Sequence, residues 1–278
     1  MKAEEILGVD RLFFVEPQFS LLTDPLCNAD LARADGEESR LLLDENEDPL
    51  ALAFRTRDCW VAGTFLCRNP TAALIEKFET MNGEIYQEDR AHWAAAVREY
   101  YSLAIKAEVP PALEDLNPKR RAILTDLITG IWNKGSGETC IDACCGSGVG
   151  SLVLRDLGFA PLSYDNDETL LSLGLATGRL LPDETMWLDA MKTSHYIDPV
   201  PKGIGIMLGE INAFSQDMWH QIVGELFAVT KETLITVGTE PEANLIKSWG
   251  EDLGRRVEIQ ENPADPIYDI WVCRAFPE

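Results

Sequence analysis

The sequence predicts an α/β protein: a doubly wound, mainly parallel sheet of seven strands with an antiparallel last strand. A mostly helical N-terminal part with a small β-sheet precedes it. Two observations carry this prediction. From residue 138 onward, short apolar runs alternate with helical segments, which is typical of parallel strands joined by crossover helices. The last two apolar runs are separated only by residues 262–268, too few for a crossover helix, so we expect them to pair antiparallel.

Length and composition indicate two folded parts. The chain has 278 residues, and 46% of them are hydrophobic, which is enough to bury a core in each part. We expect an accessory or lid domain over residues 1–115 and the Rossmann-like sheet domain over residues 116–278.

The net charge narrows the function classes. Asp and Glu number 47 against 24 Lys and Arg, giving −23, and such a surface disfavours nucleic acid or anionic lipid as the main partner. The chain has no apolar stretch of membrane-spanning length, and its first residues do not resemble a signal peptide. We therefore expect a cytoplasmic protein with no membrane contact, whose seven cysteines are free thiols.

The N-terminal part begins with weak strand patterns. Residues 40–43, 50–56 and 60–67 predict three strands, the first two joined by the acidic turn 44–49. Apolar residues at helical spacing then predict helices over residues 74–81 and 93–104.

The second part opens with a helix that starts at Asn117-Pro118 and ends before Gly135. Seven strands follow, and their predicted ranges are 139–143, 161–165, 185–188, 203–208, 233–237, 257–261 and 269–275. The predicted helices between them cover residues 150–157, 168–180, 216–229 and 242–253.

The most informative segment is residues 140–150, CIDACCGSGVG, in which a strand ends in a Gly-rich turn before a helix. Glycines let the backbone approach a ligand closely, and the start of a helix offers unpaired N–H groups. A plain tight turn between strand and helix would have the same pattern. Asp142, within this segment, either holds the turn or reaches a ligand.

An acid follows the next strand, 17 residues after Gly148. Asp165 at that strand end would lie beside the Gly-rich turn, where a carboxylate can accept both hydroxyls of a ribose. Helix capping is the alternative role, and we assign the cap to Asp167 and the ribose to Asp165.

Polar residues also end the third and fourth predicted strands. Asp189, followed by Ala190, can accept from an exocyclic amine while the neighbouring N–H donates to a ring nitrogen; a surface turn is the alternative. Glu210 and Asn212 follow the fourth strand and should face the reacting centre, because ligands bind at the carboxyl ends of parallel strands.

This ordered set resembles the class I S-adenosylmethionine (SAM)-dependent methyltransferases over roughly residues 120–278. The resemblance implies SAM as cofactor and S-adenosylhomocysteine as product. A metal or redox site at Cys144–Cys145 is an alternative, but no other Cys-x-x-Cys and no nearby His supports it, so we expect no metal. The resemblance assigns acceptor orientation or proton acceptance to Glu210 and Asn212. The implied cofactor-binding residues are Asp142, Ala143, Cys144, Gly146, Ser147, Gly148, Asp165, Asn166, Asp189 and Ala190.

Two departures from the family pattern keep alternatives open. Cys144 stands where the family has its first glycine, so a SAM-binding scaffold without catalysis remains an alternative. The segment after the fourth strand lacks the Asn/Asp-Pro-Pro-aromatic motif of nucleobase amino-methylating enzymes, which with the charge favours a small molecule or a protein side chain as acceptor. A nicotinamide-dependent oxidoreductase is the third interpretation, but the turn reads G-x-G-x-G rather than G-x-G-x-x-G.

Overall fold

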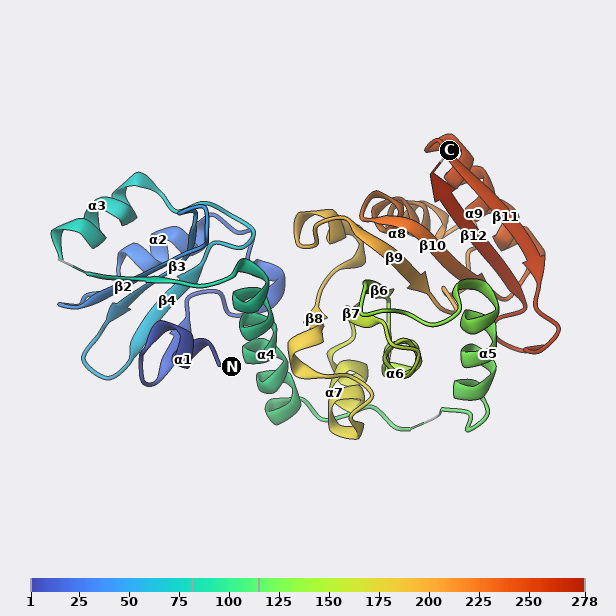
Figure 1. The fold of residues 1–278 in the computed structure, drawn as a ribbon, viewed down its shortest axis with the longest axis horizontal. Coiled ribbons are helices and arrows are strands. Elements are labelled where there is room, and N and C mark those ends of the chain that lie inside the picture. The colour runs from blue at the N-terminus through green and yellow to red at the C-terminus, as the bar shows by residue number, and fades with distance from the viewer. Residues whose placement is uncertain (1, 82, 115, 278) are drawn as a thin grey trace. The chain divides into compact units, whose positions relative to one another are not determined.

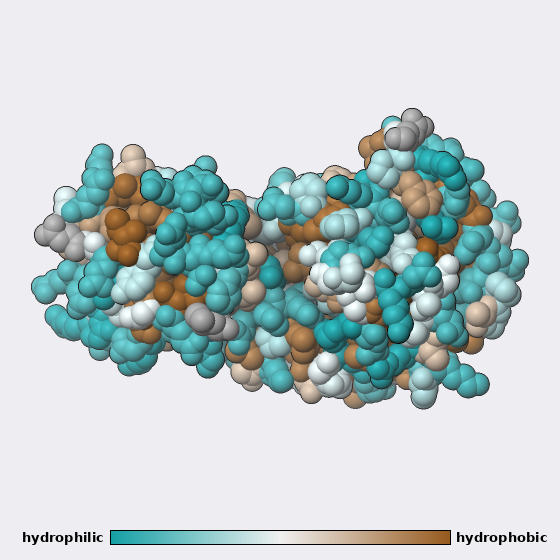
Figure 2. Space-filling view, in the orientation of Figure 1, coloured by the Kyte–Doolittle hydropathy of each residue, from teal (hydrophilic) through white to brown (hydrophobic). Residues whose placement is uncertain are grey.

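The computed structural model describes residues 2–81, 83–114 and 116–277. The chain divides into two compact units, Met1–Ala104 and Ile105–Glu278, and each contains its own β-sheet (Figure 1). Within the described residues, no helix combines the length and the apolar character needed to cross a bilayer. The face shown in Figure 2 is mainly hydrophilic, with apolar side chains in small patches.

The N-terminal unit is built on a five-stranded sheet with the order β1-β4-β3-β2-β5. The central strands β2 (Ser39–Leu43), β3 (Pro49–Arg55) and β4 (Trp60–Thr64) pair antiparallel and confirm the three predicted strands. The edge strands β1 (Leu12–Phe14) and β5 (Glu84–Gln87) are absent from the prediction, because three or four residues are too few for an alternating pattern to be recognised.

Helices surround this sheet, and two of them confirm the predicted ones. The helices of the unit are α1 (Ala3–Leu7), η1 (Phe19–Leu21), α2 (Leu26–Ala32), α3 (Ala72–Thr80) and α4 (Arg90–Glu108), whose last turn belongs to the second unit. Leu31 on α2 and Leu74 and Phe78 on α3 pack against Leu52 and Phe54 of β3, which forms a buried cluster between α2, α3 and one face of the sheet.

The C-terminal unit contains the predicted seven-stranded sheet, with the order β11-β12-β10-β9-β6-β7-β8. All neighbouring strands from β10 to β8 pair parallel, and β12 is antiparallel to both of its neighbours. The strands are β6 (Thr139–Ala143), β7 (Ala160–Asp165), β8 (Thr185–Trp187), β9 (Val200–Gly205), β10 (Thr230–Val237), β11 (Arg255–Glu261) and β12 (Trp271–Pro277).

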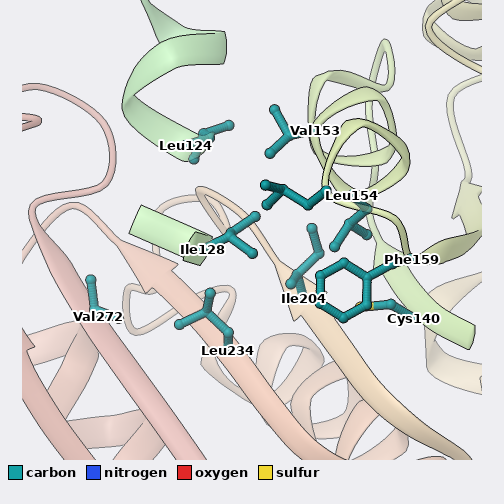
Figure 3. Close-up of a cluster of buried hydrophobic side chains, with 10 residues drawn as sticks. Leu124, Ile128, Cys140, Val153, Leu154, Phe159, Ile204, Leu234 and Val272 are labelled. Atoms are coloured by element: carbon teal, nitrogen blue, oxygen red, sulfur yellow. The ribbon is translucent and has the colours of Figure 1, made fainter. Parts of the chain in front are cut away.

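Helices lie on both faces of this sheet, as a doubly wound fold requires. They are α5 (Arg120–Trp132), α6 (Val149–Asp156), α7 (Glu168–Thr177), η2 (Pro182–Glu184), η3 (Ala190–His195), α8 (Gln216–Ala228) and α9 (Glu240–Asp252). On one face, side chains of α5 and α6 meet the strands in a buried cluster that includes Leu124, Ile128, Val153, Leu154, Cys140, Ile204, Leu234 and Val272 (Figure 3). On the other face, an added Cβ at Gly203 would lie 3.2 Å from Leu226 of α8, so this helix packs directly on the β9 backbone.

The predicted fourth strand is wrong in its position. Residues 203–208 are predicted, but β9 spans Val200–Gly205, so it ends three residues earlier. Met207 adopts a left-handed backbone (φ 54°), and its N–H donates to Thr236 Oγ1 at 2.7 Å instead of joining the sheet ladder. The apolar run Ile206-Met207-Leu208 therefore forms a buttressed turn, which a hydropathy pattern does not distinguish from a strand end.

Candidate functional site

The Gly-rich turn between β6 and α6 is stabilised by its own backbone. Cys144, Gly146 and Gly148 all have positive φ, at 52°, 53° and 83°. The Gly148 N–H donates to the Cys145 carbonyl at 2.9 Å, and the Cys145 N–H donates to the Tyr164 carbonyl of β7 at 3.0 Å. Cys144, in the position of the family's glycine, therefore keeps a left-handed backbone, at a cost of about 1–2 kcal/mol for a residue with a Cβ.

Asp142 lies beneath the start of α6 and is 1% exposed. It accepts a hydrogen bond from Ser151 Oγ at 2.6 Å, and Ser151 Oγ lies 2.7 Å from Ser163 Oγ. A Cβ on Gly150 would fall 2.7 Å from the carboxylate, so only glycine lets the helix start this close. Burial, opposed by the Ser151 hydrogen bonds, raises the pKa of Asp142 to about 7.

Asp165 joins the end of β7 to the Gly-rich turn, as its position in the sequence predicts. One carboxylate oxygen accepts from the Gly146 N–H at 2.8 Å and the other from the Asp167 N–H at 2.8 Å. The side chain belongs to a residue only 8% exposed, and burial raises its pKa although the N–H donors oppose the shift. Asp167 caps α7 by accepting from the Thr169 N–H, which confirms the capping role predicted for it, and the ribose role of Asp165 stays a prediction.

The end of β8 meets the end of β7. The Leu188 N–H donates to the Asp165 carbonyl at 3.0 Å, and Trp187 Nε1 donates to the carbonyl of Asn166, whose own side chain is exposed. Asp189 is half-buried and caps η3 by accepting from the Met191 N–H at 3.0 Å, and Ala190 behind it is buried. The third strand end is thereby adjacent to the predicted ribose acid.

The two residues predicted to act on the acceptor are exposed. Ser215 Oγ donates to the Glu210 carbonyl at 2.7 Å, and Asn212 Oδ1 accepts from the Phe214 N–H at 2.9 Å. In the part of the chain that the structure describes, neither side chain is hydrogen-bonded to the Gly-rich turn or to Asp165. The ring of Phe214 is fully exposed, so this strand end presents an aromatic surface beside a carboxylate and an amide.

Sequence reasoning missed the buried groups that hold this segment. Thr236 Oγ1 accepts from the Met207 N–H and donates to Asp269 Oδ1 at 2.6 Å; both residues are fully buried. Asp269 is paired in turn with Arg120, 3.0 Å away at the start of α5. Glu242 on α9 accepts from the Ile211 N–H at 2.8 Å. The only sequence signal for Asp269 is a single acid at the start of an apolar run.

Among residues 2–81, 83–114 and 116–277, no group of three or more His, Cys, Asp or Glu side chains is placed to hold a metal ion.

Solved structures of similar fold include three methyltransferases. They are magnesium protoporphyrin IX methyltransferase from Synechocystis PCC 6803 with bound SAM (11% identity, TM-score 0.47, covering 66% of this chain and 96% of that one), precorrin-6y C5,15-methyltransferase from Geobacter metallireducens (12%, 0.44, 62% and 95%), and an RNA methyltransferase candidate from Pyrococcus horikoshii (14%, 0.43, 64% and 94%). No protein-family model and no curated protein matches the sequence.

The fold itself is established by the strand order of this chain. Seen from the other edge, the sheet runs β8-β7-β6-β9-β10-β12-β11, and β12 is the inserted antiparallel strand. This is the class I fold of the SAM-dependent methyltransferases, which confirms the fold that the sequence predicts.

Proposed function

We propose that this protein is a SAM-dependent methyltransferase whose acceptor is a small molecule or a protein side chain. The observation that carries the proposal is the hydrogen bond from the Gly146 N–H to the Asp165 carboxylate. It joins the acid predicted to bind the ribose to the Gly-rich turn, at the carboxyl edge of a class I sheet.

The residues at this edge fit the cofactor. A carboxylate has about four lone-pair sites, and Asp165 uses two of them for backbone N–H groups, which leaves acceptors for the two ribose hydroxyls. Asp189 and Ala190 at the end of β8 would contact the adenine, and the turn around Ser147 would hold the amino-acid end. SAM supplies an electrophilic methyl group on a sulfonium, so the protein's task is to position and desolvate the acceptor.

The acceptor side fits a proton-bearing nucleophile. Glu210 offers a carboxylate and Asn212 an amide close to where the substrate atom would meet the methyl group. Glu210 would take the proton that this atom releases on methyl transfer. The net charge of −23 and the absence of the Pro-Pro-aromatic motif support a metabolite or protein acceptor over RNA.

Titration calorimetry with SAM, S-adenosylhomocysteine and NAD separates this proposal from the two alternatives. We expect both sulfur cofactors to bind and NAD not to bind. Binding of NAD alone would identify an oxidoreductase and reject the proposal. The next step is incubation with methyl-labelled SAM and fractionated cell extract, where labelled product is expected; tight binding without any label would favour the scaffold alternative.

A further inference from the structure

One arginine joins the Gly-rich turn to the segment that enters the C-terminal unit. Arg179 follows Gly178 at the end of α7 and is 9% exposed. Its Nε donates to the Ser147 carbonyl at 2.8 Å, and its Nη1 pairs with Glu114 Oε2 at 2.7 Å. The rigid guanidinium fork thus spans two chain segments that are more than 30 residues apart.

The segment Ile105–Glu114, here called the entry segment, is fastened to the same helix. Ser172 Oγ of α7 donates to the Val109 carbonyl at 2.6 Å, and the Ala112 N–H donates to the Thr169 carbonyl at 3.0 Å. Ile105 packs in a buried cluster that also holds Cys145 of the Gly-rich turn. The entry segment is therefore attached to the Gly-rich turn by apolar contact and to α7 by hydrogen bonds.

α7 and Arg179 together hold the Gly-rich turn in place around Ser147. A Cβ added at Gly174 of α7 would lie 2.9 Å from the Ser147 carbonyl oxygen. A Cβ added at Gly148 would lie 2.5 Å from the Leu180 side chain, so the turn is packed against this region without spare space. In the part of the chain that the structure describes, the Ser147 N–H has no acceptor. With its carbonyl held by Arg179, Ser147 keeps that N–H free for an anionic ligand group at the start of α6.

We infer that Arg179 is a positioning residue for the Gly-rich turn, and that its ion pair with Glu114 makes the entry segment a working part of the cofactor site. The inference rests on the proposed function, because the ligand group concerned is the carboxylate of the cofactor's amino-acid tail. A turn that is fixed before binding loses less conformational freedom when the tail binds. Loss of the Arg179 bridge should therefore weaken binding of the tail and leave binding of the nucleoside unchanged.

The test compares S-adenosylhomocysteine with 5′-methylthioadenosine, which has the same nucleoside and sulfur but lacks the amino-acid tail. Arg179→Lys retains a positive charge but cannot form both bonds. We expect this variant to bind S-adenosylhomocysteine about tenfold more weakly, with less than a twofold change for methylthioadenosine. Glu114→Gln, at a half-exposed side chain, should show the same selective loss at about threefold.

Arg155→Lys is the matched control, because Arg155 pairs with Glu184 and touches the Arg179 carbonyl but not the turn. Its affinity for both ligands should stay within twofold of the wild type. Equal losses for the two ligands, or none, in both Arg179→Lys and Glu114→Gln would overturn the positioning role while leaving the proposed function intact. Failure of the wild type to bind S-adenosylhomocysteine would reject the proposed function and this inference together.

Discussion

Two parts of the carboxyl edge are built differently. The cofactor side, where we propose that SAM binds, is the Gly-rich turn with the ends of β7 and β8, and the acceptor side, where we propose that the acceptor binds, is the segment 206–214 after β9. On the cofactor side, Asp142 and Asp165 are buried and hydrogen-bonded to neighbouring groups, as Asp165 is to the Gly146 N–H. On the acceptor side, Glu210 and Asn212 are exposed. The Asn212 side chain bonds locally to the Phe214 N–H, and Thr236 and Glu242 hold the backbone of this segment. Under the proposed function, the first arrangement suits one invariant ligand, whereas the second leaves the Glu210 side chain to be ordered by the acceptor.

The largest effect is expected from breaking the buried support of the acceptor side. Asp269→Ala leaves the Arg120 guanidinium buried, with Asp265 3.9 Å away as its remaining acidic partner, and removes the acceptor of the Thr236 hydroxyl. Losing one partner of a buried ion pair costs about 3–5 kcal/mol. Urea unfolding followed by tryptophan fluorescence measures this loss.

The control for Asp269→Ala is the neighbouring surface pair. Asp156→Ala removes the partner of Arg121, whose side chain is 55% exposed, and should cost less than about 1 kcal/mol. If the two variants are destabilised equally, the acceptor side has no buried support and the contrast between the two sides is wrong.

The contact of Asp165 with the Gly-rich turn could be predicted from the sequence because its determinants are local. The β6 range, the turn glycines and Asp165 lie within 27 consecutive residues, so spacing alone places them together. The support of the acceptor side could not be predicted, since Asp269 reaches Thr236 across 33 residues and Arg120 across 149. The misplaced fourth strand has the same origin: the hydroxyl that ends β9 belongs to β10.

The pH dependence of stability should reveal the buried acid of the cofactor side. The pKa of Asp142 is raised to about 7 in the folded state, so the folded chain binds a proton that the unfolded chain releases near pH 4. Its contribution to stability is complete below that pH and is lost as the pH rises through 7. Relative to the wild type, Asp142→Asn should therefore gain up to about 4 kcal/mol between pH 4 and pH 8.

Urea unfolding of both proteins across this pH range measures the difference, because the other titrating groups are common to both. If the stability of the two proteins changes with pH in the same way, Asp142 has the same pKa in the folded and the unfolded chain. Its carboxylate would then be better solvated than its burial indicates.

Ligand binding should separate the two sides more directly. Asp165→Ala removes the predicted ribose acceptor and should weaken S-adenosylhomocysteine binding by about 1.5–3 kcal/mol, the scale of a hydrogen bond to a charged group. Asn212→Ala, on the acceptor side, should leave that affinity unchanged while methyl transfer falls. Calorimetry on both variants tests the division: an unchanged affinity in Asp165→Ala contradicts the ribose assignment, and a weakened one in Asn212→Ala contradicts the separation of the two sides.

The smallest expected effect concerns the strain within the prearranged turn. Cys144 holds φ at 52°, where a Cβ costs about 1 kcal/mol or more and glycine costs nothing. Cys144→Gly and Cys144→Ala both remove the sulfur, but only the alanine keeps the Cβ, so their difference reports the strain free of the lost sulfur contacts. We expect the glycine variant to be more stable than the alanine variant by about 1 kcal/mol, after glycine's extra freedom in the unfolded chain has offset part of the gain.

Thermal unfolding of the two variants measures this difference in stability. An alanine variant as stable as the glycine variant would mean that the turn accommodates a side chain at this position without strain. In that case the cysteine in place of the family's glycine would be a neutral exchange, and the scaffold alternative would lose the one feature of the sequence that supports it.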